Sequence, residues 1–333
     1  MTVHVLEPTA CEGAMTAAGS PDGYAPTPAT SVGPALNADG YFVSNIAGHL
    51  YWVTDSVYQC MFLTTRSGVV LVDAPPSIGQ RLNRAIREAT AISGRPSRVT
   101  HLVYSHSHAD HIGAASIFGA DVERFGHAET ERLLSRDGDP RRPPPTVTFT
   151  GEYLLVVGGE RLELSFRGAN HSADNIFVFA PDYATLMLVD VVYPGWVPFR
   201  GLGLSQDVPG WFHAHDQALE YPFSTLVGGH VGRLGTRDDV IIQKSYLADL
   251  SDSTRAAVAA VDPAPLHDGF GPNVWARCER YTDLVCTRAA RPVIAKYARH
   301  LAGADVYTRL HAAAMLDTLR RDRGELGLFG ISQ

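Results

Sequence analysis

The stretch YSHSHADHIG at residues 104–113 constrains this chain most, because it places three histidines and one aspartate within six positions. It follows the apolar run RVTHLV, which is typical of a buried strand. His106 and His108 are two positions apart, so in extended or turn geometry both imidazoles can bind one ion. Asp110 and His111 fall at the start of a predicted helix, where they can reach a second ion. A metal site needs three or more protein ligands, so this stretch predicts further ligands elsewhere.

Three other segments place residues of the ligand type at the ends of predicted strands. His171 lies in the turn GANHSADN, Asp190 follows the apolar run LMLV, and His230 lies between glycines in LVGGHVG. Glycines there allow the backbone to pack closely against a site. Single residues of this kind are commonly structural, as core imidazoles or helix caps. Seven such side chains at four strand ends are not explained in that way, and together they predict a two-metal site.

The chain resembles the metallo-β-lactamase superfamily over roughly residues 41–262. The HxHxDH motif and the order and context of the later ligand-type residues carry this resemblance. The matching positions are His106, His108, Asp110, His111, His171, Asp190 and His230, with Asp73 in VLVDAPP. The resemblance implies an α/β (α+β) fold, a four-layer αββα sandwich of the metallo-β-lactamase type, here followed by a C-terminal helical extension.

The resemblance also divides the ligands between two ions. The first ion would take His106, His108 and His171, the second would take Asp110, His111 and His230, and Asp190 would bridge both. Asp73 is expected to orient a ligand imidazole from behind. Two Zn²⁺ are the expected metals, although the same ligands accept iron or manganese. Two cations that share a water lower its pKa from about 15.7 toward about 7, which supplies hydroxide for attack on a carbonyl.

Two residues are candidates for the chemistry itself. Asp110 is expected to accept a hydrogen bond from the hydroxide and to shuttle its proton. Tyr193 follows Asp190 by three residues, a spacing that resembles acyl-homoserine lactone lactonases, in which a tyrosine hydroxyl assists the substrate carbonyl. The equally weighted alternative is a tyrosine that packs at a strand end before an ordinary Tyr-Pro-Gly turn.

The connection at residues 193–212, YPGWVPFRGLGLSQDVPGWF, is long for a compact domain, and such connections are usually functional. Trp196, Phe199, Trp211 and Phe212 lie in it. These four side chains either form an apolar wall for an acyl chain or ring, or bury the connection against the C-terminal helices. The sequence leaves the two alternatives open.

The expected function is a metal-dependent hydrolase that cleaves a small carbonyl substrate, most plausibly an ester or lactone. A thioesterase that resembles hydroxyacylglutathione hydrolases is the alternative within hydrolysis. A mononuclear iron oxidoreductase of the persulfide-dioxygenase kind, or a metal-binding protein without turnover, is the alternative from another class. A β-lactamase is less favoured, because the apparent Asp190 bridge is absent from the main resistance enzymes. His108 stands where the redox di-iron branch typically has Glu, which favours hydrolysis.

The composition restricts the partners. A net charge of -7 and a pI near 6.0 count against nucleic acid, whose phosphates need clustered Lys and Arg. No window approaches about eighteen consecutive apolar residues, so no membrane span is expected. The four cysteines show no tight pairing, and the N-terminus has neither a basic start nor a continuous apolar core. We therefore expect a cytoplasmic enzyme with a small-molecule substrate.

The chain divides into three predicted parts. Residues 1–39 are rich in Ala, Gly, Pro, Ser and Thr and are expected to form an irregular N-terminal arm. Residues 40–262 carry the strand patterns and the ligand-type residues, and form the expected catalytic domain. Residues 263–333 form an expected helical extension, in which Leu316 and Leu319 belong to an apolar stripe that needs a partner surface. That surface is either this chain's own core or a second copy in a homo-oligomer.

Two predicted helices carry smaller expectations. In SIGQRLNRAIREATAIS, the residues Leu82, Ile86 and Ile92 are expected on one buried face. In DVPGWFHAHDQALEY, His213 and His215 have a chelating spacing, but positions i and i+2 of a helix point about 200° apart. Both histidines are therefore expected at the rim or on the surface.

Overall fold

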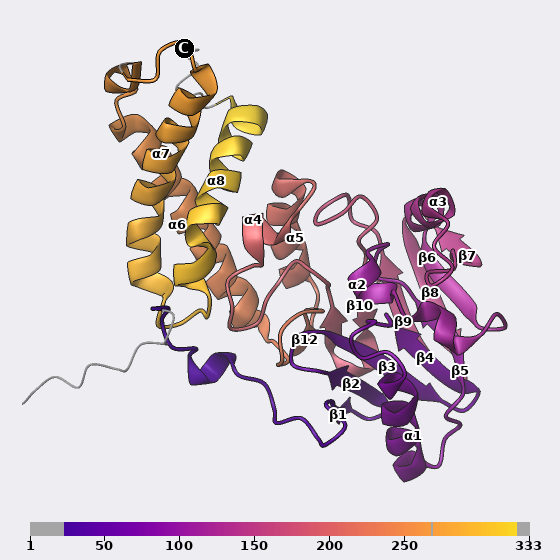
Figure 1. The fold of residues 1–333 in the computed structure, drawn as a ribbon. Helices are drawn as coiled ribbons and strands as arrows, with labels where there is room; N and C mark the ends of the chain where they lie inside the picture. The colour runs from indigo at the N-terminus through magenta and orange to yellow at the C-terminus, as the bar shows by residue number, and fades with distance from the viewer. Residues whose placement is uncertain (1–22, 268, 325–333) are drawn as a thin grey trace, which may run out of the picture.

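The computed structural model describes residues 23–267 and 269–324 (Figure 1). Two β-sheets pack face to face, and helices lie on their outer sides. The expected α/β sandwich with additional C-terminal helices is confirmed. Of the predicted parts, residues 1–22 of the arm and residues 325–333 of the extension lie outside the described residues.

The first sheet contains strands in sequence order, antiparallel from β1 to β4 and parallel from β4 to β7. The strands are β1 (Phe42–Ala47), β2 (Leu50–Thr54), β3 (Gln59–Thr65), β4 (Gly68–Val72), β5 (Val99–Val103), β6 (Glu123–His127) and β7 (Val147–Phe149). Central runs such as GVVLV are buried throughout, because one face meets the second sheet and the other is covered by helices.

The second sheet has the order β12-β11-β10-β9-β8, with β11 and β12 parallel and the other pairs antiparallel. Its strands are β8 (Glu152–Val157), β9 (Glu160–Ser165), β10 (Phe177–Ala180), β11 (Thr185–Met187) and β12 (Thr225–Val227). Strand β10 shows why both sides of this sheet are apolar. Val178 faces the core between the sheets, whereas Phe177 and Phe179 face the outer helices.

Three helices belong to the first sheet: α1 (Arg81–Ser93), α2 (Ala109–Ile112) and α3 (Ala128–Asp137). Leu82 and Ile86 of α1 are buried in the core as expected, but Ile92 is 87% exposed, so its predicted burial is wrong. At about 100° per residue, Ile92 lies about 80° around the helix from Leu82, outside the stripe that faces the sheet.

The second sheet is covered by α5 (Val208–Glu220) and α6 (Arg237–Ala260), and the chain continues into α7 (Val274–Tyr297) and α8 (Ala304–Arg323). Helices α6, α7 and α8 form a bundle that extends away from the sheets (Figure 1). Leu316 and Leu319 of α8 are buried in one core with side chains of α6, α7 and sheet two. The apolar stripe of the extension therefore has its partner surface within this chain.

Short elements complete the fold. They are the 3-10 helices η1 (Ala29–Ser31), η2 (Ala115–Phe118), η3 (Pro181–Tyr183) and η4 (Ala264–His267), and α4 (Arg200–Gly203). Apart from η1, the described part of the arm has no regular structure up to the start of β1. Among the helices that the structure describes, none is both long and apolar enough for a bilayer crossing.

Candidate metal centre

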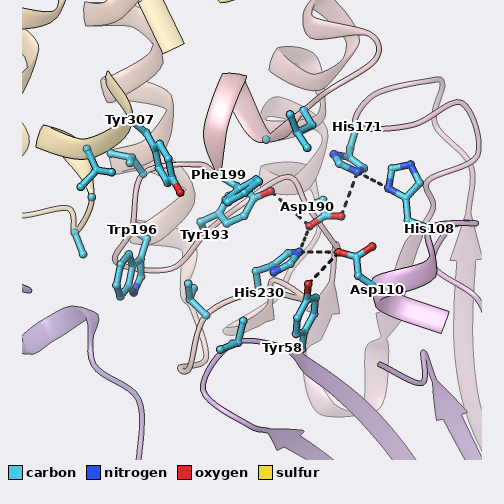
Figure 2. A pocket seen from close by; sticks show the side chains of 18 residues that line it. Tyr58, His108, Asp110, His171, Asp190, Tyr193, Trp196, Phe199, His230 and Tyr307 are labelled. Carbon is cyan, nitrogen blue, oxygen red and sulfur yellow. Dashed lines mark hydrogen bonds and ion pairs between the residues drawn. The ribbon is translucent and has the colours of Figure 1, made fainter. Parts of the chain in front are cut away.

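The seven predicted ligand residues converge at one edge of the sandwich. Figure 2 shows those that line the cavity there, namely His108, Asp110, His171, Asp190 and His230. Their ligand atoms form two groups, and within each group all atoms lie within 4.8 Å of one another. The first group is His106, His108, His171 and Asp190, and the second is Asp110, His111 and His230. The structure thus brings together the two ligand sets that the resemblance implies.

Strand topology explains why residues so distant in sequence meet here. Strand β5 ends just before the HxHxDH motif, and the parallel strands β11 and β12 end just before Asp190 and His230. Because β11 and β12 run in the same direction, both residues emerge at one edge. Gly229 has φ +83°, and an added Cβ would overlap Val189 and lie 3.2 Å from the His111 ring. A glycine is therefore required to bring His230 this close to the centre.

The carboxylate of Asp190 lies at the middle of the cluster. Its Oδ2 is 3.4 Å from His106 Nε2, 3.1 Å from His111 Nε2 and 3.2 Å from His171 Nε2. Its Oδ1 is 2.9 Å from His230 Nε2. The carboxylate thus faces imidazoles of both groups, as a bridging ligand must. Its backbone has φ +62°, a left-handed conformation that Asp adopts more readily than most residues.

The donor atoms fit divalent cations. Nε2 of His106 is buried and has no hydrogen-bond partner among the described residues. His111 Nε2 faces His230 Nε2 at 3.1 Å, and His171 Nε2 faces His108 Nδ1 at 3.0 Å. Two imidazoles bound to one zinc at about 2.1 Å lie roughly 3 to 3.5 Å apart. Imidazole with carboxylate is a common zinc set and is also accepted by iron and manganese.

Burial and charge set the protonation of the cluster. Burial lowers the pKa of His106 well below its usual range and that of His171 to about 4, so both imidazoles are neutral at pH 7. Burial also acts to lower the pKa of His111, but the Asp190 carboxylate outweighs it and raises this pKa to about 9. Burial acts to raise the pKa of Asp190, and the neighbouring imidazoles hold it well below its usual range. A cation must therefore displace a proton from His111.

Asp73 lies behind the cluster, at the end of β4, in a left-handed conformation with φ +63°. Its Oδ1 accepts a 2.8 Å hydrogen bond from the backbone N–H of Ser105, directly before His106. Its Oδ2 is buried without a hydrogen-bond partner among the described residues, and burial raises its pKa to about 6. The expectation that Asp73 orients a ligand imidazole stays a prediction, and the hydrogen bond that the structure shows fixes the backbone that carries the motif.

Tyr193 lies beside the cluster. Its hydroxyl is 3.5 Å from Asp190 Oδ1, and its ring stacks on His230 with centroids 5.9 Å apart. Burial raises the pKa of Tyr193 well above its usual range, so the hydroxyl keeps its proton. The residue is buried, as one alternative predicted, although it lies six residues beyond the end of β11. It also lines the cavity described below, as the other alternative requires.

Tyr58 also reaches the site and was missed in the sequence. Its hydroxyl lies 3.4 Å from Asp110 Oδ2, and its ring centroid lies 4.6 Å from that of His230. Burial, with a smaller effect of Asp110, raises the pKa of Tyr58 to about 12. The residue is brought there by an isolated β-bridge to His230. No local pattern around a single tyrosine in a turn signals such a pairing.

A cavity of about 490 Å³ opens onto the cluster (Figure 2). The side near the ligands is lined by Tyr58, His108, Asp110, His171, Asp190, Tyr193 and His230. The opposite side is lined by Trp196, Val197, Phe199, Gly203, Leu204, Ala302, Gly303, Val306 and Tyr307, with Val57 and Val231 completing the lining. The volume falls within the range of small-molecule sites.

The four aromatic residues of the long connection take different places. Trp196 and Phe199 line the cavity, as one alternative predicted. Trp211 is fully buried, and Phe212 packs against the core of the outer helices, as the other alternative predicted. The connection therefore forms part of the cavity wall at Trp196 and Phe199 and packs against the outer helices at Trp211 and Phe212.

A buried polar network supports Asp190 from the outer layer. The indole N–H of Trp211 donates a 2.9 Å hydrogen bond to the backbone carbonyl of Asp190. Gln243 of α6 bonds Val191 O at 2.6 Å, accepts the Tyr193 N–H at 3.0 Å and lies 2.7 Å from His215 Nε2. His215 is fully buried, so its predicted surface position is wrong.

The divergence expected for the pair in α5 is correct, because His213 is exposed while His215 points inward. His215 is the histidine that faces inward, because polar partners for its ring lie inside the fold. The His215 Nδ1 atom lies 2.9 Å from Trp211 O, and burial lowers the pKa of this imidazole to about 4. The neutral ring is thus a part of the structural support.

Comparison with known proteins agrees with this arrangement. The chain is 27% identical over 221 residues to the 2,4-dinitroanisole O-demethylase subunit alpha of Nocardioides sp. (strain JS1661), a match that covers 64% of this chain and 65% of that protein. It is 30% identical over 127 residues to metallo-beta-lactamase IND-1 of Chryseobacterium indologenes, covering 38% of this chain and 51% of that protein. Both matches span less than two thirds of the relative's own length.

Solved structures show the same fold. A metallo-beta-lactamase from Pontibacter korlensis aligns with a TM-score of 0.52 at 23% identity, over 62% of this chain and 97% of that chain. Metallo-beta-lactamase IND-7 aligns with a TM-score of 0.51 at 22% identity, over 63% of this chain and 100% of that chain. The described helices α7 and α8 follow this shared part in the present chain.

The sequence profile of the metallo-β-lactamase superfamily, which consists mostly of metal-dependent hydrolases, matches residues 53–230. This stretch is just over half of the chain, and it begins in β2 and ends at the last residue of the cluster, His230. The profile, the fold and the His/Asp cluster agree, and the chain belongs to the metallo-β-lactamase superfamily.

Proposed function

We propose that this chain hydrolyses a small ester or lactone with the help of two divalent cations. The observation that carries the proposal is the opening of the cavity onto both ligand groups, with Asp110, Asp190 and His230 in its lining. A carbonyl compound in the cavity would lie against both groups and next to the Tyr193 hydroxyl.

The protein groups would divide the work as follows. Two cations, zinc in the first place, would supply a Lewis acid and a water of lowered pKa when bound. The imidazoles of His106 and His171, kept neutral by burial, offer lone pairs to hold them. Asp110 is half exposed to the cavity, where its carboxylate can accept a proton from water and return it to the leaving group. The Tyr58 hydroxyl, 3.4 Å away, would hold that carboxylate in place.

Tyr193 is the proposed partner of the substrate oxygen. Its protonated hydroxyl lines the cavity and can donate a hydrogen bond to a carbonyl that enters. A donor aimed at an oxygen that gains charge in the transition state contributes directly to the rate. This role is the one suggested by the spacing of Tyr193 from Asp190.

A second candidate reaction is suggested by the Nocardioides relative, whose name describes O-demethylation of 2,4-dinitroanisole. Hydrolysis of an activated aryl methyl ether would consume one water and release a phenol and methanol. The aromatic residues Trp196, Phe199 and Tyr307 in the cavity wall favour an aromatic substrate. Thioester hydrolysis stays an alternative, because it uses the same attack with sulfur as the leaving atom.

The test is a substrate panel with purified protein of measured metal content. The panel compares kcat/KM for lactones, neutral esters, glutathione thioesters, β-lactams and 2,4-dinitroanisole. We expect the highest kcat/KM among the esters and lactones. Metal analysis is expected to give two zinc ions per chain and no visible absorption. One iron per chain with a visible spectrum and persulfide oxidation would instead support the oxidoreductase.

We also propose a cytoplasmic location and a small molecule, rather than nucleic acid, as the partner. The net charge of -7 and the dispersed basic residues support a partner other than nucleic acid. The four cysteines without tight pairing support the cytoplasmic location. A homo-oligomer through the C-terminal helices stays a prediction, and size-exclusion chromatography with light scattering tests it.

A further inference from the structure

We infer that the cavity wall opposite the metal centre is a subsite for an uncharged, apolar group of the substrate. This subsite is built by residues 196–204 of the long connection together with residues 302–307 at the start of α8. The inference rests on the proposed hydrolytic function for its reaction, but the binding of an apolar group can be measured separately. It assigns the C-terminal extension a direct role in substrate selection.

The chemistry of the lining supports an apolar occupant. The side chains on this wall are aliphatic or aromatic, and apart from the Tyr307 hydroxyl and the Trp196 indole N–H the polar side chains of the cavity gather at the metal end (Figure 2). No Lys or Arg occurs among the described residues that line the cavity. Arg233 lies close behind Gly195, but it is paired with the carboxylate of Asp239 at 3.0 Å. A substrate carboxylate at this wall would lose its hydration without gaining an ion pair to Lys or Arg, which is unfavourable.

The mouth of the cavity exposes large apolar side chains. Phe199 is 47% exposed, Leu204 59% and Val306 37%, and Val57 on the opposite rim is 57% exposed. All four line the same cavity, although they come from three separate segments of the chain. An exposed apolar cluster at a cavity mouth marks a place where an apolar ligand can be buried.

The wall is held rigidly to the start of α8. Trp196 and Ala302 form a β-bridge, with hydrogen bonds of 3.0 Å from Val197 N to Ala302 O and from Ala302 N to Gly195 O. His311 Nε2, on the next turns of α8, lies 3.1 Å from Phe199 O. These contacts fix both halves of the wall before any ligand arrives, which limits the entropy lost on binding.

The N-terminal arm supports the same wall from outside. The indole N–H of Trp196 donates a 3.0 Å hydrogen bond to Ser31 O, and the Ser31 hydroxyl donates a 2.6 Å bond to Gly195 O. The backbone N–H of Ala25 donates a 2.6 Å bond to Asp305 at the start of α8. The arm thus connects the two segments that build the subsite.

A strained turn completes the wall. Four successive residues, 201–204, are left-handed, and two of them, Leu202 and Leu204, are not glycine. A left-handed backbone is unfavourable for a leucine, so the surrounding structure must hold the turn. An added Cβ at Gly203 would lie 3.0 Å from the Tyr193 hydroxyl. The turn therefore brings backbone up to the proposed reaction site and leaves the Leu204 side chain at the mouth.

The test uses p-nitrophenyl esters of increasing acyl length, from acetate to octanoate, and matched esters whose acyl chain ends in a carboxylate. Each methylene that becomes buried can raise kcat/KM up to about fourfold. We expect kcat/KM to rise along the neutral series and the charged esters to be poor substrates. Val306→Glu is expected to lower the octanoate-to-acetate ratio at least tenfold. Val274→Glu, at a valine that is 44% exposed on α7 and does not line the cavity, is the matched control.

A binding measurement separates this inference from the proposed function. Calorimetry with the neutral ketone 2-octanone is expected to show binding to the wild type and to Val274→Glu, and weaker binding to Val306→Glu. If no ester is hydrolysed while 2-octanone binds in this pattern, the hydrolytic proposal fails and the subsite stands. If esters are hydrolysed without a rise along the neutral series, or if the charged esters are preferred, the subsite is overturned.

Discussion

The indole N–H of Trp211 donates a 2.9 Å hydrogen bond to the backbone carbonyl of Asp190. A helix of the outer layer therefore holds, from behind, the residue whose carboxylate lies between the two ligand groups. Asp190 has a left-handed backbone, which is less favourable than an extended one and needs such support. The position of this carboxylate depends on a buried side chain that touches no ligand atom.

Trp211→Phe removes this donor and keeps an aromatic ring, although the smaller phenyl also leaves a cavity in the core. The Asp190 carbonyl then stays buried without its partner, which costs about 1–3 kcal/mol of unfolding free energy. Metal affinity is expected to fall as well, because the carboxylate is held less firmly. Thermal unfolding of the metal-free protein and a zinc titration with a competing chelator measure the two effects. Trp275→Phe, at a tryptophan that is 78% exposed, is the control, and equal behaviour of both variants contradicts this role.

Asp190→Asn tests the bridging carboxylate. Asn adopts the left-handed backbone as readily as Asp, so the change removes the charge without adding strain. We expect turnover to fall by at least about 100-fold and metal content to fall below two ions per chain, with the fold intact by circular dichroism. His108→Ala is expected to abolish most turnover too. Asp238→Asn, at an exposed position on α6, is the control, and retained activity in the two site variants rules out the proposed centre.

Metal binding is expected to release the proton that the His111 imidazole holds in the metal-free protein. In the metal-free protein its pKa is raised to about 9, whereas His106 and His171 are neutral. Calorimetric zinc titrations in buffers of different ionisation enthalpy count the protons released. The count is expected to fall by about one per chain between pH 7.5 and pH 10. If the number of protons released on zinc binding stays constant between pH 7.5 and pH 10, the raised pKa of His111 is contradicted.

The same shift predicts how the metal-free fold responds to pH. Because folding raises the pKa of His111 from 6.5 to about 9, its protonation stabilises the metal-free protein fully below pH 6.5. This stabilisation is lost as the pH rises through 9. Thermal unfolding of the chelator-treated protein is expected to show a falling Tm over this interval.

Tyr193→Phe separates the two interpretations of this residue. If the hydroxyl assists the substrate carbonyl, kcat falls by roughly 10- to 100-fold with little change in KM. If Tyr193 only packs, kcat stays within about twofold. Tyr153→Phe, at a tyrosine of β8 outside the cavity, controls for the loss of a hydroxyl.

Gly33→Ala tests the contact between the arm and the site. An added Cβ would overlap the backbone of Gly232, which lies two residues beyond His230. Relief of this overlap moves either the arm or the His230 loop, so unfolding free energy is expected to fall by about 1–3 kcal/mol and zinc affinity with it. Gly151→Ala is the control, because its added Cβ meets no atom within 4 Å. A Gly33→Ala protein as stable as the control contradicts the contact.

The His/Asp cluster could be predicted from the sequence because its members lie close to recognisable strands. Four of them lie within six residues, and each of the other three follows or precedes a strand. The strand then fixes where the side chain emerges. Asp73 shows the limit of this reasoning: its place behind the cluster was expected, but its hydrogen bond to the Ser105 backbone was not.

The residues around the cluster could not be predicted, because they depend on pairings between distant segments. Tyr58 reaches the site through a bridge to His230, and the far wall of the cavity depends on the bridge between Trp196 and Ala302. His215 illustrates the same limit within one helix. The helical period correctly predicts that His213 and His215 point in different directions. The burial of His215, however, depends on Gln243, which lies in another helix.

The bridge between Trp196 and Ala302 has a consequence for how this protein can change. The candidate ligand residues lie between positions 106 and 230, whereas part of the opposite wall comes from beyond residue 300. If the proposed subsite is correct, substitutions in residues 302–307 would change which substrates fit, while the residues of the His/Asp cluster would stay the same. Conversely, a chain shortened before residue 302 would lose part of the lining of this cavity.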